Sequence, residues 1–246
     1  DRIVEEGFRK AFKGNWGATA HTKRLGVIQD LSRLSFFSTV CQMRKINLPF
    51  DSSAKVTGPR LLHPTQWGII CPIHTPDGGN VGLHKHLAIA TYITSAQSGY
   101  PYIKLLRERG MNLLEECPYP FLYNSSKIFV NGAWVGNHSD PERLTHTLKQ
   151  YRRTGLISIY TSISWLIKRR EVYIWTDGGR PTRPVFYMDG EPSFKNINTL
   201  FDWSKYINGE KERKAVVEYL DTEEAETSMI AMDRESIQER TTHIEI

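Results

Sequence analysis

Cysteine is scarce in this chain of 246 residues: there are three cysteines, and none lies in a Cys-x-x-Cys pair. An odd and sparse set argues against a secreted disulfide framework and for a reducing compartment. No apolar run approaches the ~18 to 20 residues that a membrane-spanning helix needs. The N-terminus also lacks the hydrophobic segment of a signal peptide. We therefore expect an intracellular protein that does not associate with membranes.

The sequence also lacks a starting methionine, internal repeats and low-complexity tracts. Its last residues, ERTTHIEI, follow a strand-like pattern without a closing turn. Hydrophobic residues make up 39% of the chain, which indicates a globular protein. The length suits one large domain or two to three small ones. From the two ends we expect a fragment of a longer protein.

The signatures of common catalytic sites are missing as well. Cys71 has histidines near it, but no nucleophile elbow or cysteine-protease pattern surrounds it, and a buried small hydrophobic role fits it better. The segment PDGGNVG lacks the Lys-Ser/Thr of a phosphate-binding loop. No paired-carboxylate metal motif occurs. We expect no catalytic residue in this chain.

Histidines and a cysteine cluster between residues 63 and 86, and zinc accepts such ligands. The candidates are His63, Cys71, His74, His84 and His86. Their spacing matches no standard zinc pattern, and isolated surface or core histidines are the commoner outcome. We expect no metal site here, although His84 and His86 would share one face of a strand.

Charge is distributed unevenly along the chain, whose formal net charge is +5. Residues 1–60 carry eleven Lys or Arg against five Asp or Glu, a net of +6, whereas residues 217–246 carry two against nine, a net of −7. This asymmetry indicates that the first part faces an anionic partner. An ordinary solvated surface explains the same counts.

Hydrophobic periodicity predicts an α+β protein. Helical patterns cover residues 1–14, 25–46, 102–110 and 140–155. Strand patterns cover residues 84–94, 127–136 and 171–188, the second containing an Asn-Gly hairpin turn. The clearest helix has Asp140 as its N-cap, Pro141 in its first position and Gly155 beyond its end. From residue 191 onward we expect a short helix, then a strand or two with an acidic turn between them.

Cationic residues gather where the second predicted helix ends and the next polar loop begins. These are Arg44, Lys45, Lys55 and Arg60. Such side chains can meet one phosphate backbone, and nearby glycines let the backbone approach a bulky ligand. Alternatively, Arg44 and Lys45 merely complement the negative end of the helix dipole. Residue chemistry leaves both interpretations open.

The segment RLLHPTQWGIICPIHTPDGGNVGLHKHLA closely resembles the signature of the second-largest, β-type subunit of multisubunit DNA-directed RNA polymerases. The residues that fill the places of that signature are Arg60, His63, Trp67, Gly68, Cys71, Pro72, Thr75, Pro76, Asp77, Gly78, Gly82 and Leu83. One departure is His74, which stands where the signature usually has Glu. A histidine there can hydrogen-bond or, if protonated, pair with phosphate.

The resemblance extends along nearly the whole chain and implies three domains. Residues 1–95 resemble the fork region, 96–192 the external 1 domain, and 193–246 an external 2 domain that stops before the hybrid-binding domain. The overall expectation is a multi-domain α+β fragment, with a helical fork region followed by mixed external domains.

In that family the fork loop helps to keep the downstream DNA strands apart near the template base. The resemblance makes residues 50–58 this loop and brings Lys55 close to DNA. It implies further nucleic-acid contacts at Arg44, Lys45, Arg60, His63, Gln66 and His74. Prolines would stiffen the segment, and a glycine such as Gly78 would supply a positive φ.

The resemblance further implies nucleotidyl transfer with two Mg²⁺ ions, held mainly by the largest subunit and not by this chain. The partners would be template DNA, nascent RNA, the largest subunit and smaller subunits. The fragment alone would be inactive. Its location would be the nucleus, or host cytoplasm or virion if it comes from a large DNA virus. The alternative is a stand-alone nucleic-acid-binding or scaffold protein that kept the fold.

Overall fold

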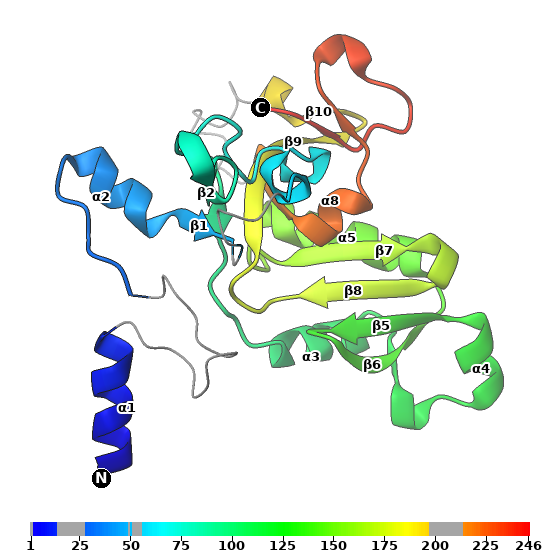
Figure 1. The fold of residues 1–246 in the computed structure, drawn as a ribbon. Helices are drawn as coiled ribbons and strands as arrows, with labels where there is room; N and C mark the ends of the chain where they lie inside the picture. Colours follow the sequence, from blue (N-terminus) through cyan, green and yellow to red (C-terminus); the bar gives the residue numbers. More distant parts are fainter. Residues whose placement is uncertain (1, 14–27, 49, 51–55, 197–213) are drawn as a thin grey trace, which may run out of the picture. The chain divides into compact units, whose positions relative to one another are not determined.

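The computed structural model describes residues 2–13, 28–48, 50, 56–196 and 214–246. It divides the chain into two compact units, Asp1–Ile89 and Ala90–Ile246 (Figure 1). Helices and strands occur in both, which confirms the α+β class. The predicted domain limits at 95/96 and 192/193 stay predictions.

The first unit combines short helices, 3-10 turns and a two-stranded antiparallel sheet. Its elements are α1 (Arg2–Phe12), α2 (Phe36–Met43), β1 (Lys45–Asn47), η1 (Gly58–Arg60), η2 (Pro64–Gln66), η3 (Gly78–Asn80) and β2 (His84–His86). The amphipathic helix predicted at the N-terminus is confirmed by α1, on which the rings of Phe8 and Phe12 stack 6.4 Å apart.

The long helix predicted over residues 25–46 is wrong in its extent. Helix α2 begins only after Ser35, whose hydroxyl accepts the backbone N–H of Ser38 while the Ser38 hydroxyl accepts the N–H of Ser35. This reciprocal cap stabilises a helix start at that point. Lys45–Asn47 leaves the helical path because it pairs with β2. Tertiary strand pairing therefore overrides the helical periodicity of these residues.

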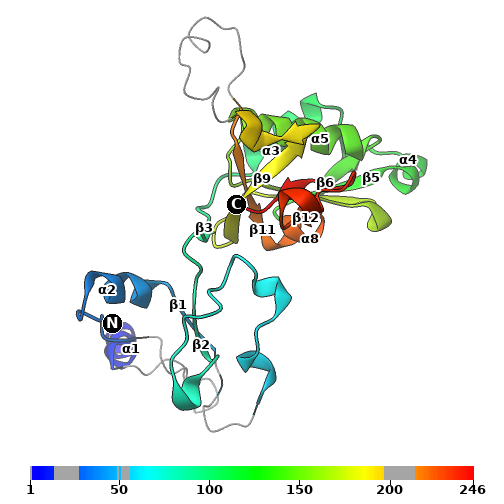
Figure 2. The same cartoon turned by 90° about the horizontal axis from the view of Figure 1, so that it is seen from above.

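The second unit holds two sheets and the helices that cover them (Figure 2). Its elements up to residue 175 are β3 (Tyr92–Ile93), α3 (Tyr100–Glu108), β4 (Asn112–Leu113), η4 (Leu114–Glu116), α4 (Tyr119–Asn124), β5 (Ser126–Val130), β6 (Ala133–His138), α5 (Pro141–Thr154), β7 (Ser162–Leu166), η5 (Ile167–Arg169) and β8 (Glu171–Trp175). The later ones are β9 (Pro181–Asp189), β10 (Glu191–Pro192), η6 (Ser193–Asn196), β11 (Val217–Asp221), α8 (Thr222–Glu226), β12 (Ile230–Ala231), η7 (Arg234–Ser236) and β13 (His243–Ile244).

The first sheet of this unit has the strand order β4-β6-β5-β8-β7, and β5 and β8 run parallel. Its inward face forms the core with α3 and α5. The buried side chains of this core are Tyr102, Leu106, Met111, Ile128, Val130, Leu144, Leu148, Ile163, Val172 and Ile174. The alternation of buried and half-buried residues along β5 and β8 is the period-two pattern of a strand with one buried face.

The local signals around this sheet are confirmed. The Asp140 carboxylate caps the N-terminus of α5 by accepting the N–H of Arg143, and Gly155 ends it at φ 80°. Asn131 and Gly132, at φ 48° and 81°, form the turn of the β5–β6 hairpin. Two positive φ angles match the twist of a tight hairpin.

Strand β9 is the centre of the second sheet, because β3, β10, β11 and β13 all pair with it. The predicted strands within 171–188 therefore exist as β8 and β9, but they lie in different sheets. The strands predicted near the C-terminus are found as β11 and β12, but the acidic stretch between them is a short helix, α8, and not a turn. The short helix predicted before these strands falls in residues 197–213, which lie outside the described residues.

A buried ionic cluster joins α5 to β11, α8 and β13. The Arg152 guanidinium donates to both oxygens of Glu224, at 2.6 and 2.8 Å, and to Glu218 at 3.2 Å. Arg153 and His243 each contact Glu218 as well, at 2.6 and 2.9 Å. The planar fork of an arginine suits such bidentate pairing. The Arg152 guanidinium thus links residues that lie 66 and 72 positions away in the sequence.

The two carboxylates of this cluster are held ionised. Burial alone would raise the pKa of Glu218, but the positive charge of Arg152, the hydrogen bond from His243 and the charge of Arg153 outweigh it, so the pKa lies well below its ordinary value. Burial also opposes ionisation of Glu224, yet Arg152 and Lys149 lower its pKa. Because folding lowers these two pKa values, the carboxylates add to the free energy of unfolding at pH values above their unfolded-state pKa. This contribution is lost as the pH falls below that value.

Replacing Arg152 by Met is expected to destabilise the second unit by about 3–5 kcal/mol, because two buried carboxylates lose their counter-charge. Denaturant unfolding measures this difference. Arg143→Met, an exposed change on the same helix, is the matched control, and we expect its effect to stay within about 0.5 kcal/mol. Equal effects of the two substitutions would show that the cluster does not hold the unit together.

Candidate nucleic-acid interface

The signature segment is built around strand β2. On one side β2 pairs with β1, with Lys45 opposite His86. On the other side the N–H of Cys71 donates to the carbonyl of His86 at 2.9 Å, and the N–H of Ala88 donates to Ile69 at 2.8 Å. The apolar half of the signature thus anchors the loop that follows it, residues 72–82, which we call the signature loop.

Arg60 holds the signature loop through side-chain hydrogen bonds, and we call this set of contacts the Arg60 clasp. Its Nη1 donates to the carbonyl oxygens of Gly79 and Val81, at 2.6 and 2.9 Å, and its Nε donates to that of Val56 at 3.2 Å. Backbone carbonyls of a loop need donors when no regular secondary structure supplies them. The guanidinium therefore fixes the signature loop against the segment that leads out of the predicted fork loop.

Thr75 and Gly82 also help to fix the shape of the signature loop. The Thr75 hydroxyl donates to the carbonyl of His84 at 3.0 Å and accepts the N–H of Gly82 at 2.8 Å. Gly82 has φ +72°, and a Cβ there would lie 2.5 Å from the Arg60 backbone. Only glycine fits this close approach without moving Arg60.

His74 lies over the ring of His86, with centroids 3.5 Å apart and planes within 6°. The His86 Nδ1 donates to the carbonyl oxygen of His74 at 3.1 Å. Burial lowers the pKa of His86, its hydrogen bond to the His74 carbonyl opposes this, and the nearby charges of His74 and Lys45 lower it further. Burial, followed by Lys45, also lowers the pKa of His84. The net effect of these surroundings favours the neutral form of His86.

The other predicted contact residues are distributed over the same unit. The Arg44 side chain, at the C-cap of α2, donates to the carbonyl of Ala88 at 2.5 Å. His63 caps η2 by accepting the N–H of Thr65, and Gln66 makes backbone hydrogen bonds within residues 63–70. Lys55 lies outside the described residues.

The structure thus brings together two groups of predicted residues. Arg60 meets the signature loop that carries His74, and Lys45 lies opposite His86, on which His74 stacks. Sequence reasoning missed the roles of Thr75, Gly82 and His86. A threonine placed before Pro76 in a glycine-rich loop was a usable signal for Thr75. The strand face shared by His84 and His86 was a usable signal for His86. No local pattern indicates which carbonyls Arg60 contacts.

Within the parts of the chain that the structure describes, no three His, Cys, Asp or Glu side chains gather as metal ligands would. In those same parts, no helix has the length and apolarity needed to cross a membrane.

Three domains of one protein family match this chain, in the order in which they are numbered in that family. The family described as RNA polymerase Rpb2, domain 3, matches residues 29–93, domain 4 matches 128–189, and domain 5 matches 211–246. The chain belongs to the Rpb2 family of RNA polymerase subunits. The signature loop lies within the part that matches domain 3.

Curated relatives agree with this assignment. The chain is 40% identical over 239 residues to DNA-directed RNA polymerase II subunit RPB2 of Encephalitozoon cuniculi, covering 94% of this chain and 21% of the relative. It is 38% identical to RNA polymerase II subunit 2 of Arabidopsis thaliana, covering 89% and 19%. It is 34% identical to RNA polymerase III subunit RPC2 of Drosophila melanogaster, covering 95% and 21%.

The chain therefore spans about one fifth of the length of these Rpb2-family relatives. All three are proteins of cellular eukaryotes, so they give no support to the viral origin considered from the sequence.

Three glycines of the first unit give a graded test of the clasp. Gly58→Ala is expected to be neutral or slightly stabilising, because its surroundings are open. Gly78→Val should cost about 1–2 kcal/mol, since φ is +78° in open space. Gly82→Ala should cost more, because backbone atoms of Arg60 must also move. Limited proteolysis of residues 56–89 measures local opening, and any other order of the three variants contradicts the geometry.

The His86 environment predicts a pH dependence. A lowered folded-state pKa means that the unfolded chain binds the proton more readily, so local stability is full above about pH 6.5 and falls as the pH drops below it. Hydrogen exchange of residues 69–88 at pH 7.5 and 5.5 should show opening at the lower pH. In His86→Gln this difference should shrink, and an unchanged difference would contradict the assignment to His86.

Proposed function

We propose that this chain is part of a DNA-directed RNA polymerase and contributes to DNA-templated RNA synthesis. Residues 1–95 act as the fork region, which separates and positions downstream DNA beside the active centre. Residues 96–192 and 193–246 act as the external 1 and external 2 domains, which scaffold the assembly. The observation that carries the proposal is the clasp of Arg60 around a signature loop within the match to Rpb2 domain 3.

The geometry of the loop supports this role. A loop that lies against DNA must keep its shape when phosphates bind near it, and the backbone of the signature loop is held by hydrogen bonds from Arg60 and Thr75. Glycines at positive φ let a backbone take tight turns next to a bulky ligand. The loop is therefore held by side chains of its own unit before any nucleic acid binds.

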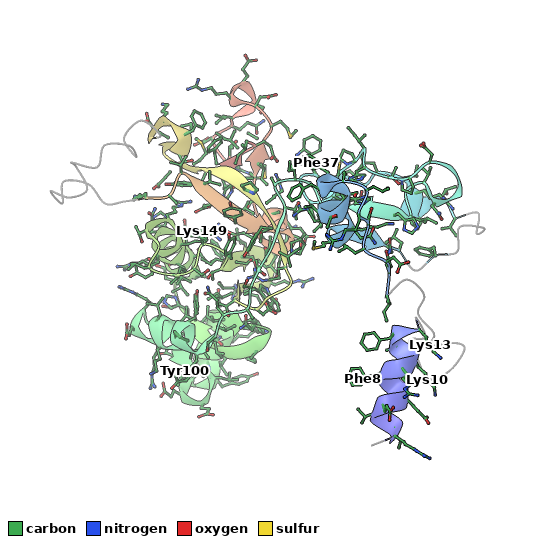
Figure 3. All side chains as sticks on the ribbon, turned by 90° about the vertical axis from the view of Figure 1, so that its left-hand side faces the viewer. Phe8, Lys10, Lys13, Phe37, Tyr100 and Lys149 are labelled. Carbon is green, nitrogen blue, oxygen red and sulfur yellow. The ribbon has the colours of Figure 1, made fainter. Side chains whose placement is uncertain are left out.

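Uncovered apolar surface in the first unit supports membership of a larger assembly. Leu34, Phe36 and Phe37 expose 94, 79 and 76% of their surface. Phe8 projects to one side of α1, and Lys10 and Lys13, the latter just after the helix, project to the other (Figure 3). The rings of Phe36 and Phe37 lie 6.1 Å apart, and exposed apolar clusters of this kind mark protein interfaces. We propose that the largest subunit, smaller polymerase subunits or the rest of the same subunit cover it.

The division of labour follows from the residues present. In the assembly, two Mg²⁺ ions would neutralise the attacking 3′ oxygen and the departing pyrophosphate, and the largest subunit would hold them. This chain would supply positioning. Lys45, Lys55, His63, Gln66 and His74 would contact template DNA or nascent RNA.

The two arginines would have a double role in this proposal. Arg44 and Arg60 contribute positive charge to the nucleic-acid cleft while their guanidinium groups hold Ala88 and the signature loop. Because arginine carries five N–H donors, a guanidinium that holds a carbonyl still brings its charge to the surface near it. We place the assembly in the nucleus, by analogy with a eukaryotic polymerase.

The experiment that tests this proposal replaces Lys55 by Ala in the intact polymerase. Loss of one phosphate contact should weaken retention of downstream DNA and reduce the slope of log K against log salt by about 1. Lys104→Ala, an exposed change on α3, is the matched control. Arg60→Ala should cause a larger loss than Lys55→Ala, because it also releases the signature loop. Unchanged elongation rate and salt dependence in both variants would contradict the proposal.

A further inference from the structure

The two stacked histidines of the first unit differ in how much of each is exposed. His74 of the signature loop is exposed, whereas His86 on β2 keeps only 8% of its surface accessible. Their ring centroids lie 3.5 Å apart and their planes are within 6° of parallel. At this separation the two rings are in van der Waals contact face to face. The buried ring of His86 therefore sets the orientation of the His74 ring.

A hydrogen bond between the same two residues fixes the tautomer of His86. Its Nδ1 lies 3.1 Å from the carbonyl oxygen of His74, and Nδ1 carries the proton because a carbonyl oxygen only accepts. In neutral His86 the lone pair is therefore on Nε2. The ring contact and this hydrogen bond together hold both the side chain and the backbone of His74 against β2.

The residue after His74 adds a further anchor. The Thr75 hydroxyl bonds to the His84 carbonyl and to the Gly82 N–H, at 3.0 and 2.8 Å. Asp77 is the one acidic residue of the signature loop, and the structure, which describes both residues, shows no ion pair between it and His74. Among the described residues, neither ring nitrogen of His74 has a hydrogen-bond partner. His74 thus has a fixed backbone and ring, and its nitrogens are available to a ligand.

The charges around His86 disfavour a proton on its ring. They come from His74, from Lys45 on β1 and from His84 on the same strand, and none of these groups is acidic. The segment bonded to the other side of β2 contributes the thiol of Cys71. Burial and these charges lower the pKa of His86, although its hydrogen bond to the His74 carbonyl opposes them. Two imidazolium rings at 3.5 Å would repel, so the pair holds one proton, at the exposed ring.

We infer that His86 is a positioning residue for His74, and that its neutral ring is the platform from which His74 presents a single proton to a phosphate group. This inference rests on the proposed function, because His74 meets phosphate only inside the polymerase. The nucleic-acid backbone and the incoming nucleotide offer the same phosphate chemistry. A ring that is already fixed binds with less loss of side-chain entropy than a mobile one.

The salt dependence of downstream DNA retention by the intact polymerase tests the pair at pH 6.5 and 8.0. His74→Gln keeps a hydrogen-bonding side chain but cannot take up the proton. At pH 6.5 the wild-type slope of log K against log salt should exceed that of His74→Gln by about 0.5 or more, because a protonated His74 neutralises a further phosphate. At pH 8.0 the two slopes should agree. We call the excess at pH 6.5 the proton-dependent gain.

A nucleotide phosphate as the ligand gives a different readout of the same gain. The KM for the nucleotide should then rise about two- to fivefold in His74→Gln at pH 6.5, in line with an exposed charge pair, and the salt slope should stay unchanged. Measuring both quantities distinguishes a backbone phosphate from a nucleotide phosphate.

Substitutions at position 86 separate a platform from a titrating group. His86→Phe keeps a flat ring beneath His74 and cannot be protonated, so the proton-dependent gain should persist. His86→Ala removes the platform, and most of the gain should be lost while the values at pH 8.0 stay unchanged. His84→Gln removes a titratable ring from the same strand and is the matched control, which should keep the whole gain. His74→Gln changes an exposed residue, so the test holds even if His86→Ala does not assemble.

Three results overturn the inference. The first is the absence of a proton-dependent gain in both the salt slope and the KM. The second is loss of the gain in His86→Phe, which would place the proton on His86. The third is a full gain in His86→Ala, which would make the platform dispensable. Lys55→Ala should reduce the salt slope at both pH values whatever the pair does, so it distinguishes failure of this inference from failure of the proposed function.

Discussion

A guanidinium group that donates to several acceptors at once is the constraint on which each unit of this fold depends. In the first unit Arg60 holds three backbone carbonyls, two of them in the signature loop. In the second unit Arg152 holds two buried carboxylates from β11 and α8. Arginine suits both tasks because its charge is permanent and its donors are fixed in one plane. Lysine would offer the charge without the fixed fork.

The two arginines act in different surroundings, and their consequences differ. Arg152 is buried, so its removal leaves uncompensated charge in the interior. Arg60 is half-buried and ties neutral carbonyls, so it sets the shape of a loop rather than the stability of a core. This difference between the two arginines supports the proposed role of the signature loop. A loop that is braced by its own unit can present His74 and the nearby cations to a polynucleotide without being ordered by it, which avoids an entropic cost of binding.

Much of the fold could be predicted from the sequence where the signal is local. The cap at Asp140, the stop at Gly155 and the Asn131-Gly132 turn depend on neighbouring residues, and all three predictions are confirmed. The helix predicted over 25–46 failed at its end because β1 pairs with a strand about forty residues away. The site followed the same rule. The signature located the loop, but the carbonyl partners of Arg60 and the ring partner of His74 are long-range contacts that no periodicity encodes.

The central claim is that the arginine-braced signature loop lies against nucleic acid in a working polymerase. The most direct test places a photo-crosslinking amino acid at position 74 of the intact polymerase and irradiates an elongation complex with labelled DNA strands and RNA. The account predicts crosslinks to downstream or template DNA near the site of nucleotide addition, and their loss in Arg60→Ala. Crosslinks to protein alone, with or without Arg60, would contradict it.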